Sequence, residues 1–364
     1  MKMRPIHTSI VNSLVASTPF VGPEALERRT GRPIELRLGA NESPFGASPL
    51  AIAAMRDQAL VTHNYGDPEA HELRQALSLQ LGVPMASIVL GAGIDELLGL
   101  SCRIFLEPND AVVTTFGSYP TFDYGASACG PVFHRVPYAN QAPDLPALLD
   151  AVKGTRAKVV YLANPDNPSG AWWTPDEIDE FRQALPYGCV LLLDEAYYEY
   201  AAGYLPLDAD DPQVIRFRTF SKAHGMAGMR IAYVVAHKDH TDALNKIRYH
   251  FGVNSIAQAG ALASLSDPAH IAQVVAQTDL GRIELREFMV SMGLKPLPSH
   301  TNFLTVDVGS KSRAESILEA LLQQGVFIRK PGLPPLDSCI RITIGRPEQR
   351  ARFAQILTDV LRTL

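Results

Sequence analysis

Thr219-Phe220-Ser221-Lys222-Ala223-His224-Gly225 is the stretch of sequence that decides the fold. The apolar, β-prone run at residues 214–217 leads into it, so Lys222 lies just past the end of a predicted strand. A lysine amine can form a Schiff base with a carbonyl compound, and the two hydroxyl groups before it, with the guanidinium of Arg230, can hold a phosphate. The combination indicates a reactive lysine beside a phosphate cup, although a lone Ser-Lys pair is more often part of a polar surface loop.

Length and composition set limits on the fold and on the function. With 364 residues the chain exceeds the roughly 250–300 that one core usually supports, so we expect a large domain and a smaller one. A net charge of −5 argues against a general binder of nucleic acids. The N-terminus lacks the apolar run of a signal peptide, and no segment approaches the roughly 18 apolar residues of a membrane span. The four cysteines have neither CxxC nor metal-ligand spacing, so we predict reduced thiols, a cytoplasmic location and no metal.

Apolar strands alternate with helices through the first two thirds of the chain. The predicted strands are 88–90, 111–115, 132–136, 157–163, 189–193, 214–217 and 231–236. Continuous apolar strands of this kind indicate a parallel or mixed sheet that is covered on both faces. Polar residues follow several of these strands, at the edge where open α/β sheets bind ligands. We therefore predict an α/β large domain, with a mixed, mostly parallel sheet between helices and one ligand site at the strand ends.

The second part of the chain has a different pattern. A long helical region covers about 239–292, with breaks near Gly252 and at Pro268. The elements predicted after it are a strand at 301–308, a helix at 312–324, strands at 326–329 and 340–344, and a closing helix from Pro347. This order indicates a smaller α+β domain. The predicted divisions are an N-terminal arm at 1–33 that joins the small domain, the large domain at 34–262 and the small domain at 263–364.

Four motifs follow one another along the chain: Asn167-Pro168-Ser169-Gly170, Asp194-Glu195-Ala196-Tyr197, Thr219-Phe220-Ser221-Lys222 and Arg230. Their order and spacing resemble those of the fold-type I aminotransferases of class I and II. Further motifs resemble the histidinol-phosphate aminotransferase branch: Leu38-Gly39-Ala40-Asn41-Glu42-Ser43-Pro44, Gly93-Ile94-Asp95-Glu96 and Arg341-Ile342-Thr343-Ile344-Gly345. The resemblance spans nearly the whole chain. It implies pyridoxal 5′-phosphate as cofactor, which needs a lysine and a phosphate cup.

For the cofactor ring, the resemblance implies several contacts. Lys222 carries the cofactor as a Schiff base, and its freed amine then moves the proton from the substrate Cα to C4′. Asp194 ends an apolar strand, where a carboxylate needs a partner, and the protonated pyridine nitrogen supplies one; a structural salt bridge or a helix cap is the alternative. Tyr197 and Asn167 hydrogen-bond the ring oxygen O3′. Phe122 stacks on the ring, with a core phenylalanine as the alternative.

For the cofactor phosphate, the resemblance implies a cup of side-chain and backbone donors. The side chains are Thr219, Ser221 and Arg230, and arginine can grip a phosphate bidentately. The backbone N–H groups of Ile94 and Asp95, which follow Gly93 at a helix N-terminus, form the other wall.

The remaining residues concern a second subunit and the substrate. Tyr65 is similar to a tyrosine that reaches the cofactor phosphate of the neighbouring subunit, which implies a homodimer with shared sites. Arg341 resembles the arginine that holds the substrate carboxylate, and Arg329 resembles one that helps to hold a substrate phosphate; an arginine on a solvated strand face is the alternative for each. Asn41 is also expected to bind substrate. Phe20 departs from the branch, because a tyrosine there would give its hydroxyl to the substrate phosphate, a hydrogen bond of about 1.5–3 kcal/mol.

Three functions are compatible with these residues. The first is an aminotransferase with a ping-pong cycle, in which a small amino donor and a keto acceptor such as 2-oxoglutarate alternate; histidinol phosphate is the leading substrate, and an aromatic amino acid follows because of Phe20. The second keeps Lys222 and Asp194 but breaks another bond at Cα, as in a decarboxylase or a β-lyase. The third, a transcriptional sensor, is disfavoured because only about 35 residues precede Leu38, with no basic DNA-binding unit.

Overall fold

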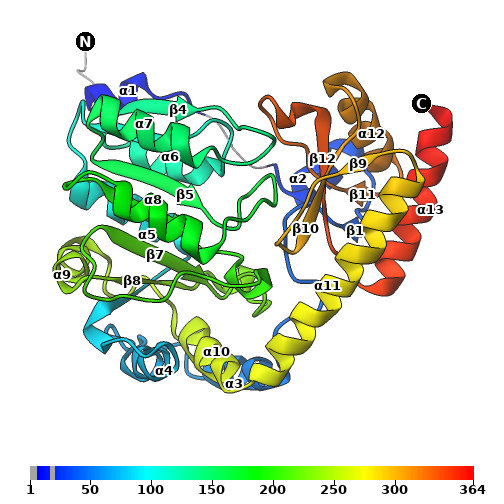
Figure 1. Cartoon of the computed structure of the whole chain (residues 1–364). Helices are drawn as coiled ribbons and strands as arrows, with labels where there is room; N and C mark the ends of the chain where they lie inside the picture. The colour runs from blue at the N-terminus through cyan, green and yellow to red at the C-terminus, as the bar shows by residue number, and fades with distance from the viewer. Residues whose placement is uncertain (1–5, 17–20) are drawn as a thin grey trace, which may run out of the picture.

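A seven-stranded sheet organises the large domain of the structure, a computed structural model that describes residues 6–16 and 21–364 (Figure 1). The strands are β2 (Ile88–Gly91), β3 (Ala111–Thr115), β4 (Val132–Val136), β5 (Val159–Ala163), β6 (Val190–Asp194), β7 (Val214–Thr219) and β8 (Ala232–Ala236). Their order is β2-β8-β7-β6-β5-β3-β4; β8 is antiparallel to both of its neighbours, and the other pairs are parallel. The predicted mixed, mostly parallel sheet is confirmed.

Helices cover both faces of this sheet, as predicted. On one face lie α5 (Ile94–Phe105), α6 (Pro120–Ser127) and α9 (Lys238–Ile247), and on the other lie α7 (Leu145–Thr155) and α8 (Pro175–Ala184). Successive residues of one strand serve the two cores, since Leu192 packs on the α5 side and Leu193 on the α8 side. A strand with no polar face is therefore a continuous apolar run in the sequence.

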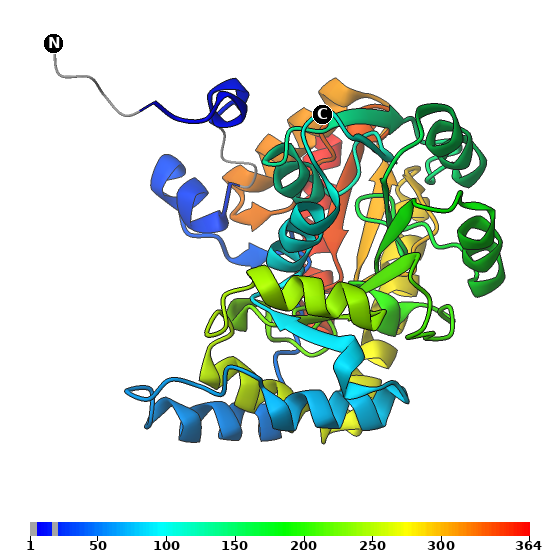
Figure 2. The ribbon, with the colours of Figure 1, turned by 90° about the vertical axis from the view of Figure 1, so that its left-hand side faces the viewer.

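A further group of helices packs at the β2 end of the sheet. It consists of α3 (Pro49–Ala59), α4 (His71–Leu81) and α10 (Ser255–Leu265), which lie side by side at the bottom of Figures 1 and 2. Their core includes Leu77 and Ala257 and also Phe220, which precedes Lys222 by two residues. These helices therefore anchor the lysine loop through Phe220.

The smaller domain is an α+β unit, as predicted. Its elements are α11 (Pro268–Ser291), β9 (Lys295–Pro296), β10 (Phe303–Asp307), α12 (Lys311–Gln323), β11 (Val326–Phe327), β12 (Cys339–Thr343) and α13 (Pro347–Thr363). β10 pairs with β9 and β12 in antiparallel register, and the three helices contribute apolar side chains to the same core. In Figure 1, α11 runs as one long helix from the large domain to the small one.

Contacts in the structure cross both of the predicted domain boundaries. β1 (Leu36–Arg37), which the predicted boundary at residue 33 places in the large domain, pairs in parallel with β11, and Leu38 lies in the small-domain core. A two-residue strand is too short to leave a pattern in the sequence. Residue 262 lies inside α10, whose side chains share a core with those of α3.

The remaining elements are short. They are α1 (Ser9–Ser13), α2 (Pro23–Thr30), and the 3-10 turns η1 (Met85–Ser87), η2 (Tyr198–Tyr200), η3 (Ala227–Met229) and η4 (Leu336–Ser338). Within residues 6–16 and 21–364, no helix combines the length and the apolar character that crossing a membrane requires.

Candidate active site

A pocket with a volume of about 590 Å³ lies at the carboxyl ends of the large-domain strands, with the small domain as its other wall. Residues that follow β5, β6 and β7 line it from the large domain, and residues 329–333 and Arg341 line it from the small domain. The predicted site residues that line this pocket are Asn41, Ile94, Asp95, Asn167, Asp194, Tyr197, Thr219, Ser221, Lys222, Arg230, Arg329 and Arg341. Segments far apart in the sequence thus meet at the sheet edge where ligands bind.

Lys222 lies three residues after the end of β7 and lines this pocket. Its Nζ donates to the carbonyl oxygen of Asn41 at 3.3 Å and lies 5.5 Å from the centre of the Tyr197 ring. Burial lowers the pKa of Lys222 to about 8, and the guanidinium of Arg341 adds to this shift. At neutral pH part of the amine is therefore uncharged, which is the form that attacks a carbonyl carbon.

Asp194 is the last residue of β6 and is held by two hydrogen bonds. Its Oδ2 accepts from Tyr161 Oη at 2.9 Å, and its Oδ1 accepts from the backbone N–H of Ala196 at 3.0 Å. Burial raises the pKa of Asp194 to about 6, while both hydrogen bonds act against this rise. A carboxylate fixed at the pocket wall in this way can accept a hydrogen bond from a cationic ring nitrogen.

Tyr197 and Asn167 are joined to the small-domain side of the pocket. Asn41 Nδ2 donates to Tyr197 Oη at 2.9 Å, while Arg341 donates through Nη1 to Asn167 Oδ1 and through Nη2 to the Gly39 carbonyl oxygen at 3.1 Å. Burial raises the pKa of Tyr197 to about 12 and lowers that of Arg341 to about 10. Arg341 Nε is buried and has no hydrogen-bond partner among the described residues.

The residues predicted for the phosphate cup line the same pocket. Thr219 Oγ1 donates to Ser221 Oγ at 2.9 Å, and Arg230 Nη2 lies 3.1 Å from Asp95 Oδ2. α5 begins here, and the first N–H groups of a helix have no partner within the helix. Gly93, with a φ of 95°, precedes this helix, and a Cβ at this position would collide with the Arg230 guanidinium. Only glycine lets the arginine and the helix N-terminus come this close.

Arg329 lies beside Arg341, to which an isolated β-bridge pairs it. Its Nη2 donates to the Val21 carbonyl oxygen at 3.3 Å, and burial lowers the pKa of its guanidinium. With Lys330, these arginines make the small-domain wall of the pocket basic and suited to anionic substrates. Phe20, predicted to contact the substrate, lies outside the described residues.

Phe122 does not take its predicted place at the cofactor ring. Its side chain is 0% exposed and stacks on Tyr161, with ring centres 4.5 Å apart and planes 6° apart. Tyr119 lines the pocket instead, and its Oη donates to Asp95 Oδ1 at 3.3 Å. α6 begins at Pro120, so Tyr119 at its N-cap stays at the strand ends while Phe122 turns into the core of the α5 side. The alternative, a core phenylalanine, describes Phe122.

Tyr65 lies outside the pocket of its own subunit. It is 85% exposed on the loop between α3 and α4, and its ring centre is 4.8 Å from that of Phe251. A side chain in this position can contribute to an active site only where a second subunit covers this face.

Sequence reasoning missed other residues of the pocket wall. Tyr161 had a usable signal, because a tyrosine inside an otherwise apolar strand needs a partner for its hydroxyl, and the neighbouring strand β6 ends in a carboxylate. Lys330 and Leu333 line the pocket from a Pro- and Gly-rich loop, whose sequence says only that it is a loop.

The fold is that of the fold-type I enzymes, and Lys222 and the buried Asp194 line its pocket. Residues 33–357 match the family model described as aminotransferase class I and II, and the chain belongs to this family. The match confirms the family predicted from the motifs.

Curated and solved relatives give the same result. The chain is 38% identical over 359 residues to histidinol-phosphate aminotransferase 1 of Nitrosococcus oceani, covering 96% of this chain and 95% of that protein. It is 37% identical to histidinol-phosphate aminotransferase 2 of Pseudomonas fluorescens, over 90% of this chain and 89% of the relative. Among solved structures, the histidinol-phosphate aminotransferase of Sinorhizobium meliloti in complex with pyridoxal 5′-phosphate matches with a TM-score of 0.95 and 44% identity, over 100% of this chain and 99% of the other.

Proposed function

We propose that this chain is a pyridoxal 5′-phosphate-dependent aminotransferase that exchanges an amino group between histidinol phosphate and 2-oxoglutarate by a ping-pong cycle. The observation that carries the proposal is that Lys222 and Asp194 line one pocket with the guanidinium groups of Arg329 and Arg341. The similarity to histidinol-phosphate aminotransferases over nearly the whole chain supports the choice of substrate.

The residues of the pocket fit the cofactor. Thr219, Ser221, Arg230 and the α5 N-terminus are the donors that a phosphate ester requires, and Gly93 provides the space between them. Tyr119 would hold the ring from its face, in the place first expected of Phe122.

The protein residues orient the cofactor and move protons. When bound, pyridoxal 5′-phosphate supplies an electron sink for charge at the substrate Cα. Asp194 would keep the ring nitrogen protonated, and Tyr197 and Asn167 would hold the ring oxygen. Lys222, partly uncharged at neutral pH, would bind the aldehyde carbon and, once released, take the proton from the substrate Cα.

Two different anions have to be held by the small-domain wall. Histidinol phosphate offers a phosphate but no carboxylate, whereas glutamate and 2-oxoglutarate offer carboxylates. A guanidinium can donate two hydrogen bonds to either group, so Arg341 and Arg329, which both line the pocket, suit both halves of the cycle. Asn41, bound to Tyr197, would keep the substrate amine beside Lys222.

A homodimer with shared sites is part of this proposal. Tyr65 would donate its hydroxyl to the cofactor phosphate of the partner. Large hydrophobic side chains are exposed around it on α3, the following loop and the α9–α10 loop: Leu50, Ile52, Leu60, Val61, Tyr249 and Phe251. Large apolar side chains exposed on neighbouring elements suit an interface between subunits.

Absorbance of the purified enzyme in the near-ultraviolet and visible range tests the proposal. Histidinol phosphate should convert the band of the lysine-bound cofactor into that of pyridoxamine phosphate, and 2-oxoglutarate should restore it. Phenylalanine serves as the matched amino donor without a phosphate. A larger response to phenylalanine would favour an aromatic aminotransferase, and release of carbon dioxide or ammonia would favour a decarboxylase or a β-lyase.

A further inference from the structure

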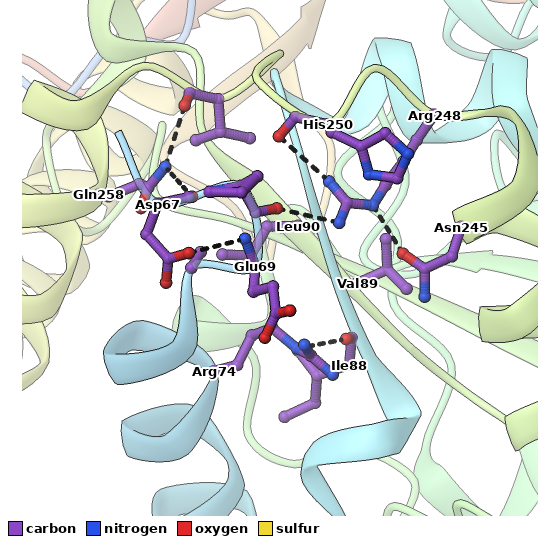
Figure 3. A pocket seen from close by; sticks show the side chains of 13 residues that line it. Asp67, Glu69, Arg74, Ile88, Val89, Leu90, Asn245, Arg248, His250 and Gln258 are labelled. Carbon is purple, nitrogen blue, oxygen red and sulfur yellow. Dashed lines mark hydrogen bonds between the residues drawn. The ribbon is translucent and has the colours of Figure 1, made fainter. Parts of the chain in front are cut away.

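Side chains of residues 248–258, which we call the α9–α10 segment, donate hydrogen bonds to backbone carbonyl oxygens of the loop that carries Tyr65 (Figure 3). We call residues 60–70, between α3 and α4, the Tyr65 loop. Arg248 Nη2 donates to the Pro68 carbonyl oxygen at 3.0 Å. Gln258 Nε2 donates to the Asp67 carbonyl oxygen at 3.1 Å and to that of Val253 at 3.0 Å. These contacts hold residues 67 and 68, just after Tyr65, whose side chain is 85% exposed.

Arg248 is built into its position from several sides. It caps α9, where its Nε donates to Asn245 Oδ1 at 2.6 Å and its Nη1 donates to the His250 carbonyl oxygen at 3.5 Å. Burial lowers the pKa of its guanidinium, and the nearby Arg74 acts in the same direction. Arg248 is half-buried and donates its hydrogen bonds to uncharged carbonyl oxygens, so its role is to hold these segments in position rather than to form an ion pair.

The cavity between these side chains is too small for a ligand. Its volume is about 10 Å³, which is about the space of a single water molecule. The polar residues around this cavity, which Figure 3 shows, therefore serve to link chain segments to one another rather than to bind a ligand.

The Tyr65 loop also approaches α10 closely. A Cβ at Gly66 would lie 3.1 Å from Ser255 Cβ and 3.3 Å from Gln258 Nε2. On the outer side, Tyr65 packs on Phe251 of the α9–α10 loop. The loop is thus held by hydrogen bonds after Tyr65, by close packing at Gly66 and by one aromatic contact.

The same α9–α10 segment reaches the phosphate cup of its own subunit. Asn254 Nδ2 donates to the Met229 carbonyl oxygen at 3.2 Å, and Met229 precedes Arg230. One segment therefore contacts both the Arg230 loop and the Tyr65 loop.

We propose that Arg248 and Gln258 are positioning residues that hold Tyr65 ready for the cofactor phosphate of the partner subunit. The inference rests on the shared sites of the proposed function and deepens them. If the loop were mobile, the entropy lost on ordering it would offset much of the free energy of the Tyr65 hydrogen bond. A loop that is already held in place avoids this loss.

A double-mutant cycle on cofactor affinity tests the inference, with pyridoxal 5′-phosphate titrated into the full-length apoenzyme. Tyr65→Phe should weaken binding about 10- to 100-fold, the range for a hydrogen bond to a charged group. Arg248→Gln should weaken it about five-fold or more. The double variant should bind no more weakly than Tyr65→Phe alone, because Arg248 acts through Tyr65.

Arg74→Gln is the matched control. Arg74 lines the same cavity, but its Nε and Nη2 donate to the carbonyl oxygens of Ile88 and Met85, at 3.0 and 2.8 Å. Its loss should leave cofactor affinity within about two-fold. Hydrogen exchange of the apoenzyme adds a readout without cofactor: Arg248→Gln and Gln258→Met should speed exchange in the Tyr65 loop, and Arg74→Gln should not.

Two outcomes would overturn the inference and can be told apart. Losses from Tyr65→Phe and Arg248→Gln that simply add would show that Arg248 acts elsewhere, while the shared site would stand. Unchanged affinity in Tyr65→Phe would remove the shared site and the inference with it. Neither result bears on transamination, which the response to histidinol phosphate tests separately.

Discussion

Tyr161 Oη donates a 2.9 Å hydrogen bond to Asp194 Oδ2 between the neighbouring strands β5 and β6. The tyrosine is buried and stacked on Phe122, so its hydroxyl has a fixed direction. Burial raises the pKa of Asp194 to about 6, and this hydrogen bond is the larger of the two that oppose the rise. Tyr161 therefore helps to keep Asp194 ionised, the state in which it can stabilise a protonated ring nitrogen.

Tyr161→Phe should move the acid limb of the pH profile of kcat/KM to higher pH. Removing a donor to the carboxylate raises the pKa of Asp194, so more of it is protonated and inactive at neutral pH. A hydrogen bond of about 1.5–3 kcal/mol corresponds to a shift of about one to two pH units. Steady-state rates between about pH 5 and 9 measure this shift.

Tyr138→Phe provides the control for this experiment. Tyr138 is also buried, and its Oη donates to Asp166 Oδ2 at 3.0 Å, but neither residue lines the pocket. Its loss should reduce stability and leave the acid limb in place. Equal shifts in both variants would contradict the role given to Tyr161.

The capture of pyridoxal 5′-phosphate by the apoenzyme should depend on pH with a midpoint near 8. Burial lowers the pKa of Lys222 to about 8, and only the uncharged amine attacks the aldehyde. The capture rate should therefore rise as the pH passes through 8. Stopped-flow absorbance measures the rate, and Lys222→Ala should give no band of lysine-bound cofactor at any pH.

Arg341→Gln tests how much the charge of Arg341 contributes to the lowered pKa of Lys222. A positive neighbour disfavours protonation of Lys222, so its removal should move the midpoint upward, toward that of an ordinary lysine. Arg329→Gln removes an equal charge from the residue bridged to Arg341 and should have a smaller effect. A midpoint near 10 in the unmodified enzyme would contradict the expected influence of burial.

Tyr119→Leu and Phe122→Leu should separate cofactor binding from stability. Tyr119 lines the pocket, so its loss should weaken cofactor binding about three- to ten-fold, in line with the roughly 0.5–1.5 kcal/mol of an aromatic contact. Phe122 is a core residue, so its loss should lower the unfolding free energy of the apoenzyme by roughly 1–2 kcal/mol. Cofactor titration and urea unfolding of both variants measure the two effects. Weaker cofactor binding in Phe122→Leu and lower stability alone in Tyr119→Leu would indicate that Phe122, and not Tyr119, contacts the cofactor ring.

The contrast between Tyr119 and Phe122 shows what the sequence could predict. Motif order and strand ends predicted the sheet and the residues that follow its strands, because residues directly after parallel strands meet at one edge. Phe122 was misplaced because its direction depends on the residue at which α6 begins, and helix boundaries are the least certain part of a sequence pattern.

Small-domain contributions were harder to predict for a related reason. Arg341 could be placed from its motif, but Lys330 and Leu333 come from a loop with no periodicity to orient them. The pairing of β1 with β11 joins segments about 290 residues apart, and two residues carry no alternation from which to infer a partner.

Glu199→Gln should stabilise the protein at alkaline pH. Burial raises the pKa of Glu199 to about 8; the charge of Glu195 adds to this rise, whereas the guanidinium of Arg218 opposes it. The nearest imidazole atom, His224 Nε2, lies 3.6 Å from its Oε1. Folding thus keeps a proton that the unfolded chain loses above about pH 4.5, and the unfolding free energy falls as the pH rises from there to about 8, by at most about 1.4 kcal/mol per pH unit.

Glutamine has the same shape and no charge, so the fall in unfolding free energy that Glu199 causes is absent in the Glu199→Gln variant. Urea unfolding of the apoenzyme, at one protein concentration and at several pH values from about 5 to 9, should show the variant gaining over the natural protein as the pH rises, with no further gain above about 8. Burial lowers the pKa of His224 to about 4, so this imidazole is uncharged in the folded natural protein over the measured pH range. Glu180→Gln, at an exposed position on α8, controls for the change of charge alone. If the variant and the natural protein differ by a constant amount at every pH, Glu199 is ionised in the folded protein and its proton is not held by burial.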